Sequence, residues 1–138
     1  MQSLEEYLKE YIDKVAKKAK EGKTKVKTIT LAGHSLGASI ATVAALGIAE
    51  QIEQLNLPAF QPKVNLVSYA SPKVGGKNLW KRLIELNVAY DHYFNDGDVV
   101  PMAPPFYRHH PDPKTQHKLK PADKELRDKG FHSIKVSE

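Results

Sequence analysis

The sequence predicts a single α/β domain over residues 1–138, with a mostly parallel sheet and flanking helices on both of its faces. Three observations support this fold class. Helix and strand patterns alternate along residues 3–94, which favours parallel strands joined by helical crossovers. The chain is long enough for one hydrophobic core, and 41% hydrophobic with 27% charged residues is typical of a globular protein. A serine between two glycines also separates the first strand pattern from the second helix pattern.

Three helices are expected, at residues 3–21, 38–54 and 77–87. In the first, apolar residues recur at three- and four-residue steps, and Gly22 provides a stop signal. The second is rich in alanine and glycine, so it should lie close against the sheet. The third is short and carries several large apolar residues.

Three strands are expected, at residues 25–32, 63–70 and 88–94. The first is rich in β-branched residues, and the third alternates so that Tyr90 and His92 share one face. Five prolines within residues 101–113 argue against any regular element there, and a short helix is expected at 121–129. Three strands are few for a sheet covered on both faces, so the domain looks reduced or partial.

Composition excludes several classes of function. The chain has no cysteine, which removes disulfides, thiol catalysis and cysteine-based zinc sites. The net charge of +5 comes largely from lysines around the end of the first helix, where they favour the helix dipole without a nucleic-acid partner. Contact between this basic end and a lipid surface is a weaker interpretation. The acidic, amphipathic start is no signal peptide, so a natural start at Met1 would favour the cytosol.

The chemistry centres on Gly33-His34-Ser35-Leu36-Gly37, a G-x-S-x-G sequence between a strand and a helix. A serine on a tight turn at the end of a strand projects its Oγ above the sheet. We expect both flanking glycines to be required, because a Cβ at either would collide with the neighbouring helix and strand. The helix that follows points its free N–H groups toward the nucleophile. A plain strand-to-helix turn would not require this serine.

A serine nucleophile needs a base, and the base needs an orienting carboxylate. In α/β-hydrolases these follow in the order serine, acid, histidine, and Asp98 and His132 fit that order. Asp96 competes for the acid role, but its position before Gly97 suits a turn better.

Five other histidines compete with His132 for the base. His34 lies inside the serine turn and cannot reach back, and His92 falls within a strand as a packed side chain. The remaining three histidines and one aspartate could together bind a metal ion: His109, His110, Asp112 and His117. Adjacent histidines in a proline-rich loop are, however, more often solvent-exposed.

Three stretches resemble the class 3, or fungal-type, lipases. They are the serine motif at residues 30–38, the strand and turn Tyr-Ala-Ser-Pro-Lys-Val-Gly at 69–75, and Asn-Asp-Gly-Asp-Val-Val-Pro followed by prolines at 95–105. All three occur in the family's order. Ala70, Lys73 and Gly76 depart from the family's usual glycine, arginine and asparagine.

The resemblance implies an α/β-hydrolase fold, acylglycerol or phospholipid substrates, and no cofactor. It implies Ser35 as nucleophile, Asp98 as triad acid and His132 as base. Leu36 and His34 are then the oxyanion- or substrate-binding candidates. The expected reaction is ester hydrolysis through an acyl-enzyme.

The resemblance also implies upstream strands and a loop that supply a second oxyanion donor and a lid. The chain has barely 30 residues before the serine motif. We therefore expect a fragment, a reduced variant, or an oligomer that completes the sheet. The competing hypothesis is a non-catalytic remnant that serves binding or assembly. Gly75-Gly76-Lys77-Asn78 lacks the glycine and hydroxyl residue of a phosphate loop, which argues against a nucleotide-binding module.

Overall fold

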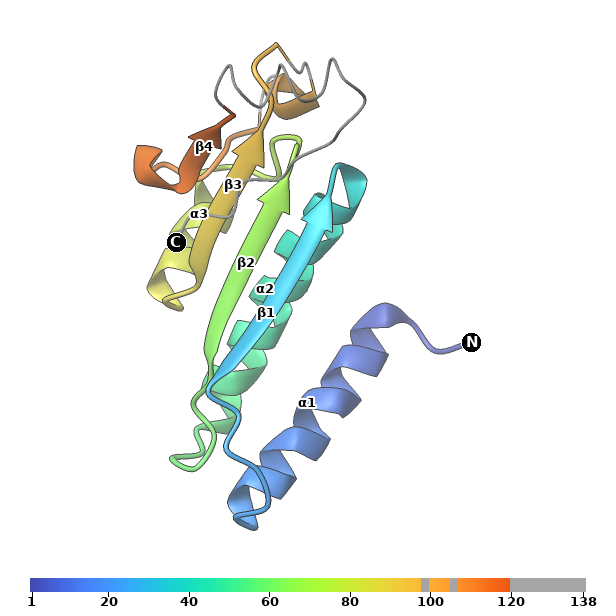
Figure 1. Cartoon of the computed structure of the whole chain (residues 1–138). Helices are drawn as coiled ribbons and strands as arrows, with labels where there is room; N and C mark the ends of the chain where they lie inside the picture. Colours follow the sequence, from blue (N-terminus) through green and yellow to red (C-terminus); the bar gives the residue numbers. More distant parts are fainter. Residues whose placement is uncertain (98–99, 105–106, 120–138) are drawn as a thin grey trace.

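The computed structural model describes residues 1–97, 100–104 and 107–119. The helices in it are α1 (Leu4–Lys20), α2 (Leu36–Leu55) and α3 (Lys77–Glu85), and the strands are β1 (Thr28–His34), β2 (Lys63–Tyr69), β3 (Ala89–Phe94) and β4 (Gln116–Lys118). The strands form one sheet in the order β1-β2-β3-β4, and every neighbouring pair is parallel (Figure 1). The α/β class is confirmed, and the carboxyl ends of all strands lie at one edge of the sheet. None of the described helices combines the length and apolar character that a bilayer crossing requires.

Helix α1 has the boundaries that its sequence predicts to within one residue. The Ser3 hydroxyl accepts a hydrogen bond from the Glu6 N–H at 3.2 Å, and the Glu6 carboxylate accepts one from the Ser3 N–H at 3.4 Å. This capping box satisfies two N–H groups at the helix start. At the other end Gly22 adopts a φ of 73° and its N–H bonds to the carbonyl of Ala19, which ends the helix.

Helix α2 packs closely on β1 and β2 through small side chains, as its composition predicts. Four alanines on its sheet-facing side are almost completely buried: Ala38, Ala41, Ala45 and Ala49. The buried Thr42 hydroxyl donates to the Ala38 carbonyl at 2.8 Å, so this polar group is satisfied within the helix. The helix begins at Leu36, directly after Ser35, rather than at residue 38.

One face of the sheet carries the core. Leu31, Leu66 and Tyr90 occupy equivalent positions on β1, β2 and β3. Leu66 and Tyr90 belong to one buried apolar cluster, and Leu31 packs against it. The Trp80 ring of α3 lies 5.2 Å from the Tyr90 ring, which places α3 on the same face as α2. Helix α1 adds Ile12 and two alanines to the same cluster by packing on α2.

The expectation of helices on both faces is therefore wrong for the described part of the chain. The opposite face of β1 is exposed at Thr30, Ala32 and His34. Figure 1 shows α2 and α3 on a single side of the sheet. The sequence pattern of alternating helices and strands does not distinguish the two arrangements, because each crossover is locally the same.

Strand β1 starts later than predicted because its partner limits it. Thr28 pairs with Lys63, the first residue of β2, and Pro62 before it has no N–H to continue the ladder. The strand instead continues through Gly33 and His34 to the serine turn. Strand β3 agrees with its prediction to within one residue, and Tyr90 and His92 face the core as expected.

The fourth strand was missed by the sequence analysis. Gln116–Lys118 pairs with residues 92–94 of β3 at the edge of the sheet. Two short 3-10 turns, Val100–Met102 and Pro113–Thr115, form at the two ends of the proline-rich stretch, so the expectation of no regular element there is also wrong. Pro113 starts its turn, where no N–H is needed, and the Asp112 carboxylate caps that turn by accepting from the Lys114 N–H at 3.0 Å. The helix expected at 121–129 lies outside the described residues.

Candidate active site

Ser35 lies on a strained turn between β1 and α2. Its backbone has φ 54° and ψ −121°, a combination that L-residues rarely adopt. The Ser35 N–H donates to the Tyr69 carbonyl at 2.9 Å, which fixes the turn to the end of β2. Such a conformation costs about 1–3 kcal/mol and persists only where the surroundings impose it. The predicted serine turn is therefore present at the carboxyl edge of the sheet.

The two glycines beside Ser35 have different roles. A Cβ on Gly33 would overlap the carbonyl group of Gly37 and lie 2.7 Å from the backbone nitrogen of Ala38. The first residues of α2 thus pack directly on the Gly33 backbone. A Cβ on Gly37 would meet no described atom within 4 Å. The expectation of collision is confirmed at Gly33 and wrong at Gly37, because Gly37 already lies in the helix with its Cβ direction open.

The amino end of α2 presents free backbone donors next to Ser35. The Ala38 N–H returns to the Ser35 carbonyl at 3.0 Å, whereas the Leu36 N–H has no hydrogen-bond partner among the described residues. The Leu36 side chain is 72% exposed. An unpaired N–H at the positive end of a helix favours a negatively charged oxygen. His34, the last residue of β1, is exposed beside this turn and lies opposite Tyr69 in the sheet.

The predicted acid and base, Asp98 and His132, lie outside the described residues. The chain on either side of Asp98 is placed. Asp96 and Gly97 form a turn after β3, as predicted for Asp96, and the Asp96 carboxylate lies 3.2 Å from the Lys118 ammonium. Because β1 and β3 are parallel, this turn leaves the sheet at the edge that carries Ser35.

His92 is the most deeply buried titratable group at this edge, with 1% of its surface exposed. Its Nε2 accepts a hydrogen bond from the Ser71 N–H at 2.9 Å, so Nε2 carries no proton. Its Nδ1 therefore carries the proton and donates to the Gln116 side-chain oxygen at 2.7 Å. Burial lowers the pKa of His92 to about 4, which keeps the ring neutral at ordinary pH.

His109 and His110 pack against aromatic rings and are half-buried, so the expectation that they are solvent-exposed is wrong. The His109 ring stacks 4.9 Å from His92, and its Nε2 contacts the Pro101 carbonyl. The His110 ring stacks 5.5 Å from Tyr90. Burial lowers the pKa of both His109 and His110.

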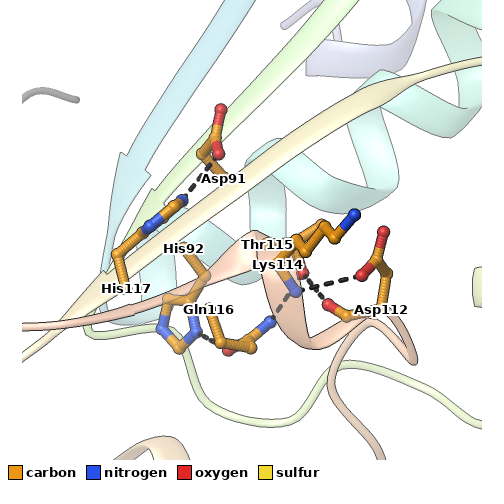
Figure 2. Close-up of polar contacts among 7 residues, drawn as sticks. All are labelled: Asp91, His92, Asp112, Lys114, Thr115, Gln116 and His117. Atoms are coloured by element: carbon orange, nitrogen blue, oxygen red, sulfur yellow. Dashed lines mark hydrogen bonds and ion pairs between the residues drawn. The ribbon is translucent and has the colours of Figure 1, made fainter. Parts of the chain in front are cut away.

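His117 lies on the other face of the sheet from His92. Figure 2 shows Gln116 and His117, neighbours on β4, turned to opposite sides, so that each meets a different residue of β3. The His117 Nε2 lies 2.7 Å from the Asp91 carboxylate, and the ring stacks 4.6 Å from Tyr93. The Asp112 N–H donates to His110 Nδ1 at 3.0 Å, whereas His117 pairs with Asp91 on the opposite face of the sheet. Among the described residues, no group of three acidic or histidine side chains could hold a metal ion.

The β2–α3 turn is held by hydrogen bonds to distant segments. Ala70 has a φ of 51°, and its N–H donates to the Tyr93 carbonyl at 2.7 Å. Further along, the Lys73 N–H donates to the Ala103 carbonyl at 2.7 Å, and the Gly75 carbonyl accepts from the Arg108 N–H at 2.9 Å. The turn is thereby tied to the chain that follows Asp98.

The sequence predicts only a packed side chain at His92 and no part in the site for Gln116 or Ser71. The available signal was the position of a histidine on the core face of a strand, where a buried polar ring requires partners. The identity of those partners depends on the fourth strand, which was not predicted.

Comparison with known proteins places these features in a family. The family model described as "Lipase (class 3)" matches residues 1–108. The chain is 32% identical over 92 residues to phospholipase A1-Igamma2, chloroplastic, of Arabidopsis thaliana, which covers 67% of this chain and 17% of that protein. It is 40% identical over 93 residues to phospholipase A1-II 7 of Oryza sativa subsp. indica, covering 60% of this chain and 22% of that protein.

Part of a solved structure has a similar fold. The native Rhizomucor miehei lipase propeptide complex matches with a TM-score of 0.51 and 26% identity, over 72% of this chain and 30% of that chain. A second structure, of the Rhizomucor miehei triacylglyceride lipase, matches with a TM-score of 0.52 and 24% identity, which shows the fold alone. The chain thus corresponds to part of an α/β-hydrolase fold and spans less than a quarter of the two plant relatives described above.

Proposed function

We propose, from the premise that this chain belongs to the class 3 lipase family, that it hydrolyses acyl esters of lipids with Ser35 as nucleophile. The observation that carries the proposal is the backbone of Ser35. A non-glycine residue with φ 54° and ψ −121° is costly, and an ordinary strand-to-helix turn needs no such residue. Gly33 packing on α2 and the bond from the Ser35 N–H to Tyr69 both support this conformation.

In the first step of the proposed reaction, His132 removes the proton from the Ser35 hydroxyl as its Oγ attacks the ester carbonyl. The carbonyl oxygen becomes an oxyanion. The Leu36 N–H at the start of α2, which has no partner among the described residues, is a suitable donor to it, and the helix dipole favours the same charge. The intermediate then expels the alcohol, which takes the proton from His132 and leaves an acyl group on Ser35.

In the second step, water attacks the acyl-enzyme with His132 again acting as base. The fatty acid leaves and the Ser35 hydroxyl is restored. Asp98 would hold the His132 ring in the correct tautomer and stabilise its charged form. Support for Asp98 comes from the turn after β3, which leaves the sheet at the edge where Ser35 lies.

The substrate class follows from the relatives. They are named as phospholipases A1, and a related Arabidopsis thaliana protein is named as a galactolipase, so acyl esters of polar lipids are the first substrates to test. Exposed apolar side chains near the nucleophile, Leu36 at 72% and Ile40 at 49%, suit contact with acyl chains. No cofactor or nucleic acid is part of this proposal.

The second candidate is a non-catalytic lipase-like module that serves binding or assembly. The observation that favours it is that β1 ends the described sheet and exposes one face, together with the exposed apolar residues of α2. A second copy of the chain, or further lipase sequence, could cover these surfaces.

Hydrolysis assays separate the two candidates. Purified protein would be incubated with dispersed phosphatidylcholine and monogalactosyldiacylglycerol, and released fatty acid would be measured. We expect Ser35→Ala to lower the rate by at least about 10³-fold, because removing a triad nucleophile disables the whole unit. Ser39→Ala, one helical turn further along α2, is the matched control and should retain the rate.

Two results would contradict the proposal. Equal hydrolysis by the wild-type chain and Ser35→Ala would show that the activity belongs to another group. Complete inactivity of a folded wild-type sample toward both lipids would favour the non-catalytic module.

A further inference from the structure

We infer that His92 is a positioning residue that joins three segments: the turn after β2, which holds the backbone of Ser35, the loop that follows the proposed acid, and β4. This inference rests on the proposed function for its catalytic meaning and on described contacts for its geometry. Among the described residues, His92 makes no contact with Ser35. It acts through the segments that it holds.

The first segment is the turn after β2. The neutral Nε2 of His92 accepts from the Ser71 N–H at 2.9 Å. Two residues earlier, the Tyr69 carbonyl accepts from the Ser35 N–H at 2.9 Å. The bond to His92 therefore fixes the backbone that holds the strained conformation of Ser35.

The second segment is the loop that follows β3 and contains Asp98. The His109 ring stacks on His92 at 4.9 Å and its Nε2 contacts the Pro101 carbonyl. Pro101 is buried within the short turn Val100–Met102. His92 thus provides the flat surface against which this loop is anchored, immediately after the proposed acid.

The third segment is β4, which precedes the part of the chain that carries His132. The Nδ1–H of His92 donates to the Gln116 side chain at 2.7 Å, as Figure 2 shows. Gln116 in turn donates to the Thr115 hydroxyl at 3.2 Å. Strand β4 has only three residues, and this side-chain bond adds to its backbone pairing with β3 and to the His117–Asp91 contact.

A histidine suits this role because one neutral ring both accepts and donates. The Ser71 N–H requires an acceptor, the Gln116 oxygen requires a donor, and His109 and Phe94 stack against the ring at 4.9 and 5.1 Å. A lysine or arginine could not accept, and a phenylalanine could do neither.

Two substitutions separate the hydrogen bonds. In His92→Gln, the side-chain oxygen can reach the position of Nε2 and accept from Ser71. In His92→Asn, the shorter amide can replace Nδ1 and reach Gln116, but leaves the Ser71 N–H unpaired. Both lose the ring stacking, so they are matched in packing. His117→Asn is the control on the opposite face, because it breaks the Asp91 pair on the same two strands.

Two measurements would be made on each full-length variant: hydrogen exchange of peptides covering residues 70–76 and 100–104, and the rate of labelling by a fluorophosphonate. We expect faster exchange of both peptides and an approximately 10- to 100-fold slower labelling in His92→Asn, because small displacements of reacting groups are costly. His92→Gln should restore most of the labelling rate. A purely structural role would slow both variants alike. His117→Asn should change neither readout.

The outcomes separate this inference from the proposed function. Equal labelling rates in His92→Asn and His92→Gln, or unchanged exchange in His92→Asn, would overturn the role of His92. A wild-type chain that is protected from exchange but never labelled would contradict the proposed function, and would leave His92 with no reaction to position.

Discussion

The turns after β1 and β2 leave neighbouring parallel strands at the same edge of the sheet, yet they are stabilised in different ways. Each begins with a non-glycine residue of positive φ, 54° at Ser35 and 51° at Ala70. The first turn enters α2 at once, and the contact of Gly33 with the backbone of α2 supports it. The second runs through Ser71–Gly76 before α3 begins and is tied to distant residues.

This difference shows that local steric packing and hydrogen bonds to distant residues both stabilise the carboxyl edge of the sheet. Apart from the bond between the Ser35 N–H and the Tyr69 carbonyl, the β1–α2 turn depends on a nearby residue, Gly33, that has no room for a side chain. The β2–α3 turn depends on His92, Ala103 and Arg108, which come from elsewhere in the chain. A substitution beside the first turn should therefore act strongly and alone, whereas the second should respond to conditions that affect its distant partners.

The largest effect is expected from Gly33→Ala. The new Cβ would overlap the Gly37 carbonyl and approach the Ala38 nitrogen at 2.7 Å, and backbone atoms cannot move aside as a flexible side chain could. We expect the free energy of unfolding to fall by about 3 kcal/mol, measured by urea denaturation.

Gly37→Ala is the matched comparison for that variant. Its Cβ would meet no described atom within 4 Å, and alanine favours a helix over glycine by about 1 kcal/mol. We expect unchanged or slightly raised stability. If the two variants were equally destabilised, the local explanation of the β1–α2 turn would be wrong.

The second turn should respond to pH through His92. Its pKa is about 4 in the folded chain and near 6.5 when unfolded, because burial disfavours the charged ring. Between these values the unfolded chain binds a proton that the folded chain does not. Stability should therefore fall as the pH decreases from about 6.5 to 4, by roughly 3 kcal/mol from this group, and then level off. Urea midpoints across this range measure the effect.

His92→Phe should flatten this pH dependence without removing it. The buried His109 and His110 also have lowered pKa values and act in the same direction. A slope that is identical in wild type and His92→Phe would rule out His92 as a source of acid sensitivity.

The smallest effects are expected from relieving the strain itself. Glycine adopts positive φ readily, so Ser35→Gly and Ala70→Gly should each raise stability by up to about 1 kcal/mol, after the entropy cost of glycine is subtracted. The two should differ in chemistry: Ser35→Gly removes the nucleophile, while Ala70→Gly should still react with a serine probe. Calorimetry with parallel labelling would check both, and a loss of stability in Ser35→Gly would show that the turn is unstrained.

Most of the fold could be predicted because its determinants are local. Capping at Ser3, the stop at Gly22 and the alanine-rich face of α2 all act within a few residues. That the helices cover only one face of the described sheet could not be predicted, because the sequence of a helical crossover is similar whichever face the helix packs on. Strand β4 was missed because three residues after a proline-rich stretch have no pattern of their own and are ordered by pairing with β3.

The site divides in the same way. The position of Ser35 could be predicted from the glycine, serine and glycine between a strand and a helix, although only Gly33 proves sterically necessary. The contacts of His92 could not be predicted, because its partners Ser71 and Gln116 become neighbours only when the sheet forms. Asp98 and His132 remain predictions, tied to the order of residues along the chain.

The central claim is that Ser35 is an activated nucleophile, and covalent labelling tests it most directly. The folded chain would be treated with a fluorophosphonate, digested, and the modified residue located by mass spectrometry. The account predicts one adduct on Ser35, absent from Ser35→Ala and retained in Ser39→Ala. An unlabelled Ser35 in a folded sample, or an adduct on another serine that persists in Ser35→Ala, would contradict it.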